Sequence, residues 1–197
     1  MSNTEFVVWL RDCRACEPAI EWVVANGYDR IEAWAKCHRG DWLLWFAARA
    51  GCDHVEIVKA ACACVRTALE CVPPLERQPL AAIEAAEAWC RCPSAANAAN
   101  AEHAARAARA VALDCSTAAS AAECTASAVH ADHADHAASA VFRAARAVAF
   151  RAAFAAELDA GAASAVADCA YDDAQARMAD IVRGIVVYPP AQARDRF

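Results

Sequence analysis

Apolar residues recur three to four positions apart along most of the chain, which is the spacing of helices that bury one face. Glycines, prolines and short polar runs interrupt this pattern where helices are expected to end. The pattern predicts helices over residues 4–26, 29–39, 41–51, 53–71, 77–92, an alanine-dominated block from 94 to about 160, and a last helix from Asp168 or Asp172 to just before Pro189. Strands need alternating β-branched and aromatic residues, and Ile185–Tyr188 is the one candidate. We therefore predict an all-α fold.

Short polar residues and glycines mark the expected helix ends. The aspartates that can accept hydrogen bonds from free backbone N–H groups at a helix start are Asp29, Asp41 and Asp53. Glycines stand at three of the stops, Gly27, Gly40 and Gly51. We expect Gly40 to end one helix in the left-handed conformation and Asp41 to cap the next helix.

A chain of 197 residues can form one domain with a sizeable core. We expect a single domain over residues 1–190, with a tryptophan-rich half (1–93) and an alanine-rich half (94–190), followed by a loose tail (191–197). The predicted architecture is seven to nine helices arranged as an antiparallel bundle or as a short helical-hairpin solenoid.

One sequence repeat bears on the choice between bundle and solenoid. The seven residues RAARAVA occur at Arg106–Ala112 and again at Arg143–Ala149, an offset of 37 residues. That offset suits a repeated helical hairpin. The abundance of alanine also makes a chance match easy, so both interpretations stay open.

Charge and composition narrow the function classes. The net charge of −6 and the absence of a clustered basic face argue against nucleic-acid binding. The first residues, MSNTEFVVWLRDC, lack the basic start and long apolar run of a secretory signal, and no apolar stretch reaches about 18 residues. We therefore expect a cytoplasmic protein that does not enter membranes. Its twelve cysteines are then expected to be reduced thiols.

The most distinctive motif is Trp34–Trp45, which reads W-A-K-C-H-R-G-D-W-L-L-W. Together with Ala82–Trp89 (A-I-E-A-A-E-A-W) and the alanine-rich helical region that follows, it resembles the immunity proteins of bacterial polymorphic toxin systems, the Imm5-like group. The resemblance implies an all-α protein that binds and neutralises a cognate toxin domain. For a protein with this function, we expect the mechanism to be steric and electrostatic occlusion: a preformed helical surface covers the toxin's active site, without chemistry of its own.

Two readings of this motif stay open at the level of single residues. Asp41 and Trp42 can form a helix corner packed on tryptophan in the core. Alternatively, if they are exposed, they can contact the partner, because tryptophan is enriched at interface hot spots.

Metal binding is the alternative function. His130, His133 and His136 recur every third residue, and Cys124 precedes them by six positions on roughly the same side of a continuous helix. Neighbouring histidines of this stripe could chelate one ion on such a helix. A solvated polar stripe is the simpler interpretation.

The sequence does not indicate an enzyme or a bound cofactor. It has no nucleophile elbow and no glycine-rich phosphate loop. Cys37 and His38 are neighbours on a predicted helix, so their side chains diverge and cannot form a dyad. The pair Cys13 and Cys16 is also expected on a helix, without the preceding strand that thioredoxin-like chemistry requires. We interpret most cysteines as small core residues.

Overall fold

The computed structural model describes residues 1–69, 77–112, 117–130, 135–155 and 160–188. Within these ranges the chain forms ten helices and no strand. The helices are α1 (Asn3–Asp12), α2 (Glu17–Asn26), α3 (Arg30–Lys36), α4 (Gly40–Arg49), α5 (His54–Leu69), α6 (Arg77–Arg91), α7 (Ala95–Ala112), α8 (Thr117–Ser127), α9 (Asp135–Ala155) and α10 (Ala160–Ile185). The predicted all-α class is confirmed, and the helix count lies slightly above the predicted seven to nine.

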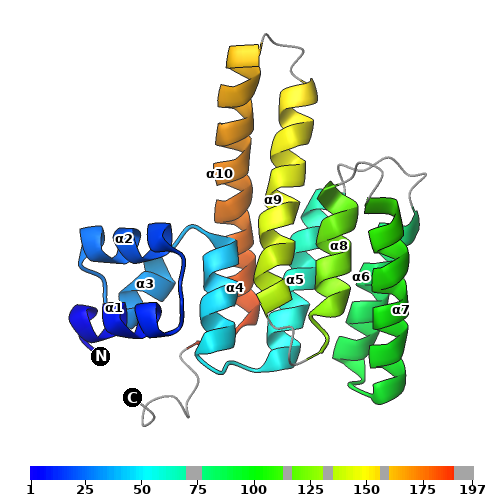
Figure 1. Ribbon diagram of the computed structural model, residues 1–197, viewed down its shortest axis with the longest axis horizontal. Helices are drawn as coiled ribbons and strands as arrows, with labels where there is room; N and C mark the ends of the chain where they lie inside the picture. Colours follow the sequence, from blue (N-terminus) through cyan, green and yellow to red (C-terminus); the bar gives the residue numbers. More distant parts are fainter. Residues whose placement is uncertain (70–76, 113–116, 131–134, 156–159, 189–197) are drawn as a thin grey trace.

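The helices form a bundle with a small side group (Figure 1). From α5 onward, each helix packs against the one that follows it. The long helix α5 also packs against α8, α9 and α10, whereas in a solenoid each repeat contacts only its neighbours. Helix α4 joins the bundle through α9 and α10, and α1–α3 lie beside α4 as a separate group.

The two RAARAVA copies lie on different helices of this bundle, α7 and α9. Arg106 and Arg143 are both exposed, and Ala108 and Ala145 are both buried. The alanines that directly follow the two arginines differ, because Ala107 is exposed whereas Ala144 is buried. Among the positions whose side chains are described, the two copies therefore share their environment only in part.

The prediction is wrong for the start of the last helix, which is Ala160 and not Asp168 or Asp172, and for the first helical segment. Residues 4–26 form two helices, separated by a turn at Cys13–Cys16. Arg14 takes a left-handed conformation there with φ 61°. Pro18 stands in the first turn of α2, where a backbone N–H has no hydrogen-bond partner within the helix, so the N–H that proline lacks is not needed. The apolar period continues across the turn because both helices bury a face in the same core. Cys13 and Cys16 thus lie in a turn, not on a helix as predicted.

The predicted caps are confirmed where they depend on local sequence alone. Asp29 accepts hydrogen bonds from the backbone N–H groups of Ile31 and Glu32 at the start of α3. Gly27 and Gly51 have left-handed φ values of 67° and 74°. Asp53 accepts from the N–H of Glu56 at the start of α5.

The corner at Gly40 is built differently from the prediction. Arg39 is the N-cap of α4, no side chain caps this helix, and Asp41 lies inside its first turn. Gly40 is not left-handed. A Cβ added to it would lie 2.8 Å from Cβ of Met178 and 2.9 Å from the backbone carbonyl carbon of Met178 on α10. Glycine is needed here because α4 and α10 approach backbone to backbone.

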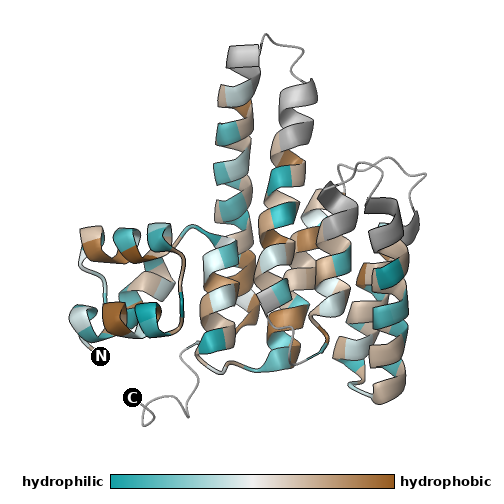
Figure 2. Cartoon of the chain, viewed as in Figure 1, coloured by the Kyte–Doolittle hydropathy of each residue, from teal (hydrophilic) through white to brown (hydrophobic). Residues whose placement is uncertain are grey.

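The core changes in composition along the chain. Large side chains fill the region around α1, α3 and α4, where Trp34 and Phe46 pack on Tyr188 with ring centroids 4.5 and 5.0 Å away. Buried alanines dominate the contacts of α7–α9, so these helices pack with little side-chain volume between them. Figure 2 shows polar and apolar residues on the same helices, as expected of helices with one buried face. Over the residues that the structure describes, no helix has the length and apolarity needed to cross a membrane.

The close approach at Gly40 gives a first prediction. Gly40→Ala is expected to lower the free energy of unfolding by about 2 kcal/mol, because backbone atoms of α10 must move to admit the methyl group. Gly184→Ala on α10 is the matched control, since a Cβ at Gly184 meets nothing within 4 Å. That substitution is expected to stabilise the protein by about 0.5–1 kcal/mol, because alanine is the better helix former. Urea unfolding of both variants tests this, and equal effects at the two sites would contradict it.

Candidate functional site

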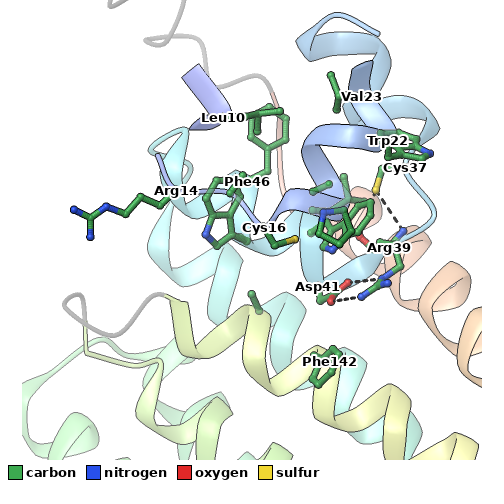
Figure 3. Close-up of a pocket in the computed structure, with 18 of the residues that line it drawn as sticks. Leu10, Arg14, Cys16, Trp22, Val23, Cys37, Arg39, Asp41, Phe46 and Phe142 are labelled. Carbon is green, nitrogen blue, oxygen red and sulfur yellow. Dashed lines mark hydrogen bonds and ion pairs between the residues drawn. The ribbon is translucent and has the colours of Figure 1, made fainter. Parts of the chain in front are cut away.

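A pocket of about 500 Å³ lies between the side group α1–α3 and helices α4 and α9. Figure 3 shows it in close-up. Its walls are mainly apolar, and the aromatic residues that line it are Phe6, Trp22, Trp42, Trp45, Phe46 and Phe142. Pockets of this size that are apolar with a few polar groups are typical ligand or side-chain receptors.

Neighbouring aromatic rings fix the walls of the pocket. The ring of Trp22 on α2 lies 6.2 Å from that of Trp42 on α4 and 5.2 Å from that of Tyr28. Asn3 on α1 donates a hydrogen bond of 2.7 Å to the backbone oxygen of Tyr28, which ties α1 to the turn between α2 and α3. The side group is therefore held by both ring packing and backbone contacts.

The polar feature of the pocket is a bidentate ion pair. Nε and Nη2 of Arg39 donate to the two carboxylate oxygens of Asp41 at 2.9 and 2.7 Å. The guanidinium also lies over the rings of Trp42 and Tyr171, 4.7 and 5.3 Å from their centroids. Burial alone would lower the pKa of Arg39, but the hydrogen bonds and charge of Asp41 raise it above its usual value.

A short chain of hydrogen bonds connects this pair to α10. The backbone N–H of Asp41 donates to Oε1 of the fully buried Gln175 at 3.4 Å, and Nε2 of Gln175 donates to the hydroxyl of Tyr171 at 3.1 Å. Arg183, further along α10, donates to the carbonyl oxygens of Trp34 and Cys37 at the end of α3. Helix α10 therefore positions both sides of the corner that carries Arg39.

The structure brings the two predicted partner-contact residues to this one pocket but gives them different environments. Trp42 is half-buried and lines the wall. Asp41 is buried, with 7% of its surface exposed, and both of its oxygens are used by Arg39. The exposed carboxylate that a direct contact would need is not present. A role for either residue in partner binding stays a prediction.

Sequence reasoning missed the opposite walls of the pocket. Trp22 and Phe142 lie on α2 and α9, 120 residues apart, and Arg14 comes from the turn before α2. A tryptophan on α2 and a phenylalanine in an alanine-rich segment were the available signals. Neither indicates a shared site without the fold.

The histidine stripe does not form one helix face. Helix α8 ends at Ser127 and α9 begins at Asp135, so His130 follows one helix and His136 lies in the first turn of the next. The two histidines line a second pocket of about 360 Å³, together with Glu102 and Glu123. Cys124 is buried in the core, and His133 lies outside the described residues.

Metal binding by this stripe stays a prediction. Among the side chains that the structure describes, no group of three or more histidines, cysteines or acidic residues is close enough to hold a metal ion. The prediction of one continuous helix through the stripe is wrong, because α8 ends at Ser127, before His130.

The described cysteines range from buried to exposed. Burial raises the pKa of Cys37 and Cys52 to about 11 and that of Cys64 to about 12. The thiol of Cys64 donates to the backbone oxygen of Met178 on α10. These thiols are core residues of low reactivity, as the sequence suggested.

Comparison with known proteins adds no identification: no family model, no curated protein and no solved structure matches this chain.

The Arg39–Asp41 pair gives a second prediction, tested by a double-mutant cycle. Arg39→Ala and Asp41→Ala are each expected to lower the free energy of unfolding, because either single change leaves the remaining charge without its partner. The double variant is expected to lose about 2 kcal/mol less free energy of unfolding than the sum of the two single losses. The exposed pair Arg106–Glu102 is the control, with an expected coupling of about 0.5 kcal/mol or less. Equal coupling in both pairs would show that burial of the Arg39–Asp41 pair does not matter.

Thiol labelling gives a third prediction. A thiol with a pKa of about 11 is only about one-thousandth ionised at pH 8, and Cys37 and Cys52 are in addition buried. The exposed Cys16, Cys92 and Cys169 are expected to react with iodoacetamide at least about a hundredfold faster. Peptide mass mapping of the native protein after timed labelling measures each site. Labelling of Cys37 at the rate of Cys169 would contradict the burial described here.

Proposed function

We propose that this protein is an immunity-type binding protein, which neutralises a cognate toxin domain by covering its active site. The observation that carries the proposal is the aromatic pocket, whose wall includes half-buried Trp42 from the motif that resembles the Imm5-like group. In this reading the pocket receives an apolar side chain of the toxin domain, and the surrounding surface blocks access to the toxin's site.

The chemistry of the lining favours binding over catalysis. The charged side chains that line the pocket are Arg14, Arg39 and Asp41, and the last two neutralise each other through two hydrogen bonds. A catalytic acid or base needs a proton that it can exchange near neutral pH, whereas the pKa of Arg39 is raised further above that range. Aromatic walls, in contrast, provide large contact area at a low entropic cost.

The pocket is also well placed for tight binding. Ring packing of Trp22 on Trp42 and Tyr28 fixes the wall before any partner arrives. A preformed receptor loses less conformational entropy on binding than a mobile one. Occlusion by such a surface requires no chemical step.

Native mass spectrometry tests the proposal directly. The protein is purified under reducing conditions from cells that carry its own neighbouring genes. A stoichiometric complex with a second protein encoded there supports the proposal, provided that the protein also suppresses the toxicity of that partner. Mass increments of zinc or copper without any partner would instead favour the alternative, metal binding through the histidine stripe.

Truncation of the pocket wall gives a fourth prediction. Trp42→Ala and Phe142→Ala are each expected to weaken the complex about tenfold or more, because each removes part of the anchor site. Ile31→Ala is the matched control, since Ile31 is 57% exposed on α3 and does not line the pocket. Isothermal titration gives the affinities, and circular dichroism checks that the helices are retained. Equal weakening by Ile31→Ala would contradict the assignment of the pocket.

A further inference from the structure

We propose that Cys62 on α5 and Cys90 on α6 are a redox-active thiol pair, in which hydrogen peroxide oxidises Cys90 and Cys62 then closes a reversible disulfide between the two helices. The pair is independent of the proposed function, because neither cysteine lines the aromatic pocket. Helices α5 and α6 pack directly against each other, and the two thiols meet at their interface.

The two thiols form a short chain of hydrogen bonds. A side-chain hydrogen bond joins Cys62 to Cys90, and the thiol of Cys90 donates to the backbone oxygen of Val55, with 3.9 Å between sulfur and oxygen. Because the proton of Cys90 is directed at Val55, the thiol of Cys62 is the donor between the two sulfurs. Sulfurs that share a hydrogen bond need only a small movement to reach the bonding distance of a disulfide.

Two further contacts hold α5 against α6 on either side of Cys62. Arg66, one turn further along α5, donates from Nε and Nη2 to the two carboxylate oxygens of Glu87 on α6 at 2.5 and 2.7 Å. At the start of α5, the ring of His54 packs on Trp89 with 5.3 Å between the ring centroids. The register of the two helices, and with it the position of Cys62 opposite Cys90, is therefore fixed by contacts outside the thiol pair.

The surroundings give the two thiols different roles. The hydrogen bond from Cys62 lowers the pKa of Cys90, and the positive charge of Lys59 also lowers it, whereas burial and Glu87 act in the opposite direction without cancelling these effects. The same hydrogen bond, together with burial, raises the pKa of Cys62 well above its usual value. Cys90 is therefore the thiol that ionises and attacks, and Cys62 is the thiol that keeps its proton.

Access from solvent follows the same division. Cys90 is half-buried, so a molecule as small as peroxide reaches its sulfur, whereas Cys62 has only 2% of its surface exposed. An oxidised Cys90 thus lies beside a thiol of its own chain that larger molecules cannot reach. Closure within the protein is favoured over a mixed disulfide with another molecule.

The reaction consists of two balanced steps. The Cys90 thiolate attacks one oxygen of hydrogen peroxide, the O–O bond breaks, and a sulfenic acid and hydroxide form. The sulfur of Cys62 then attacks the sulfur of Cys90, the S–O bond breaks, and the oxygen leaves as water with the proton of Cys62. The two sulfurs together lose the two electrons that the peroxide gains. An added dithiol such as dithiothreitol returns these electrons and restores both thiols.

Peptide mapping of the wild-type protein tests the proposal without any substitution. Tryptic peptide 78–91 contains Cys90 as its one cysteine, and peptide 60–66 contains Cys62 and Cys64. The native reduced protein is treated with one equivalent of hydrogen peroxide, alkylated in denaturant and digested without reduction. The expected main cross-link joins these two peptides and disappears after dithiothreitol. Peroxide treatment that oxidises the exposed cysteines but leaves both peptides alkylated would overturn the proposal.

Variants then assign the roles within the pair. Cys62→Ala is expected to abolish the cross-link and to leave Cys90 as a sulfenic acid, which dimedone traps on peptide 78–91. Cys90→Ala is expected to abolish both products. Cys64→Ala is the matched control, because Cys64 is also buried on α5 and shares the tryptic peptide of Cys62. This variant is expected to keep the cross-link. A cross-link that persists in Cys62→Ala, with circular dichroism showing native helicity, would overturn the assignment.

Discussion

The arrangement of this protein depends on the close approach of α4 to α10 at Gly40. Met178 occupies the space that a side chain at position 40 would need, and its carbonyl accepts from Cys64 on α5. Three helices therefore meet around one residue. Because α4 begins at this point, the same contact sets the direction in which Arg39 and Trp42 leave the helix. The pocket wall is thus a consequence of a packing constraint that lies outside the pocket.

The polar network behind the wall adds specificity to this packing. A buried ion pair contributes little net stability once the cost of removing its charges from water is included. Its geometry is nevertheless demanding, since Asp41 must satisfy Arg39 with its carboxylate and Gln175 with its backbone N–H. An alanine-rich bundle has few large side chains to define its register. We expect that this network helps to choose one arrangement of α4 on α10 among several of similar packing energy.

The accuracy of the sequence predictions follows from how local each interaction is. The helical class, the Asp29 cap and the left-handed Gly27 depend on a few neighbouring residues, and these predictions are confirmed. Asp41 has the sequence context of a cap, but its carboxylate pairs with Arg39 instead. The surroundings of this pair include Tyr171 and Gln175, which lie 130 or more positions further along the chain. The break after Ser127 carries no glycine or proline, so the histidine stripe looked continuous. The pocket unites α2, α4 and α9, and nothing in the sequence relates them.

The left-handed backbone at Arg14 has a consequence for how this protein can change over time. A non-glycine residue in that conformation costs roughly 1 kcal/mol relative to glycine. Glycine or asparagine at this position would lower that cost, so the stability of the turn alone does not favour arginine here. Trp22 and Trp42, in contrast, pack against each other, so both of these residues contribute to the stability of the fold.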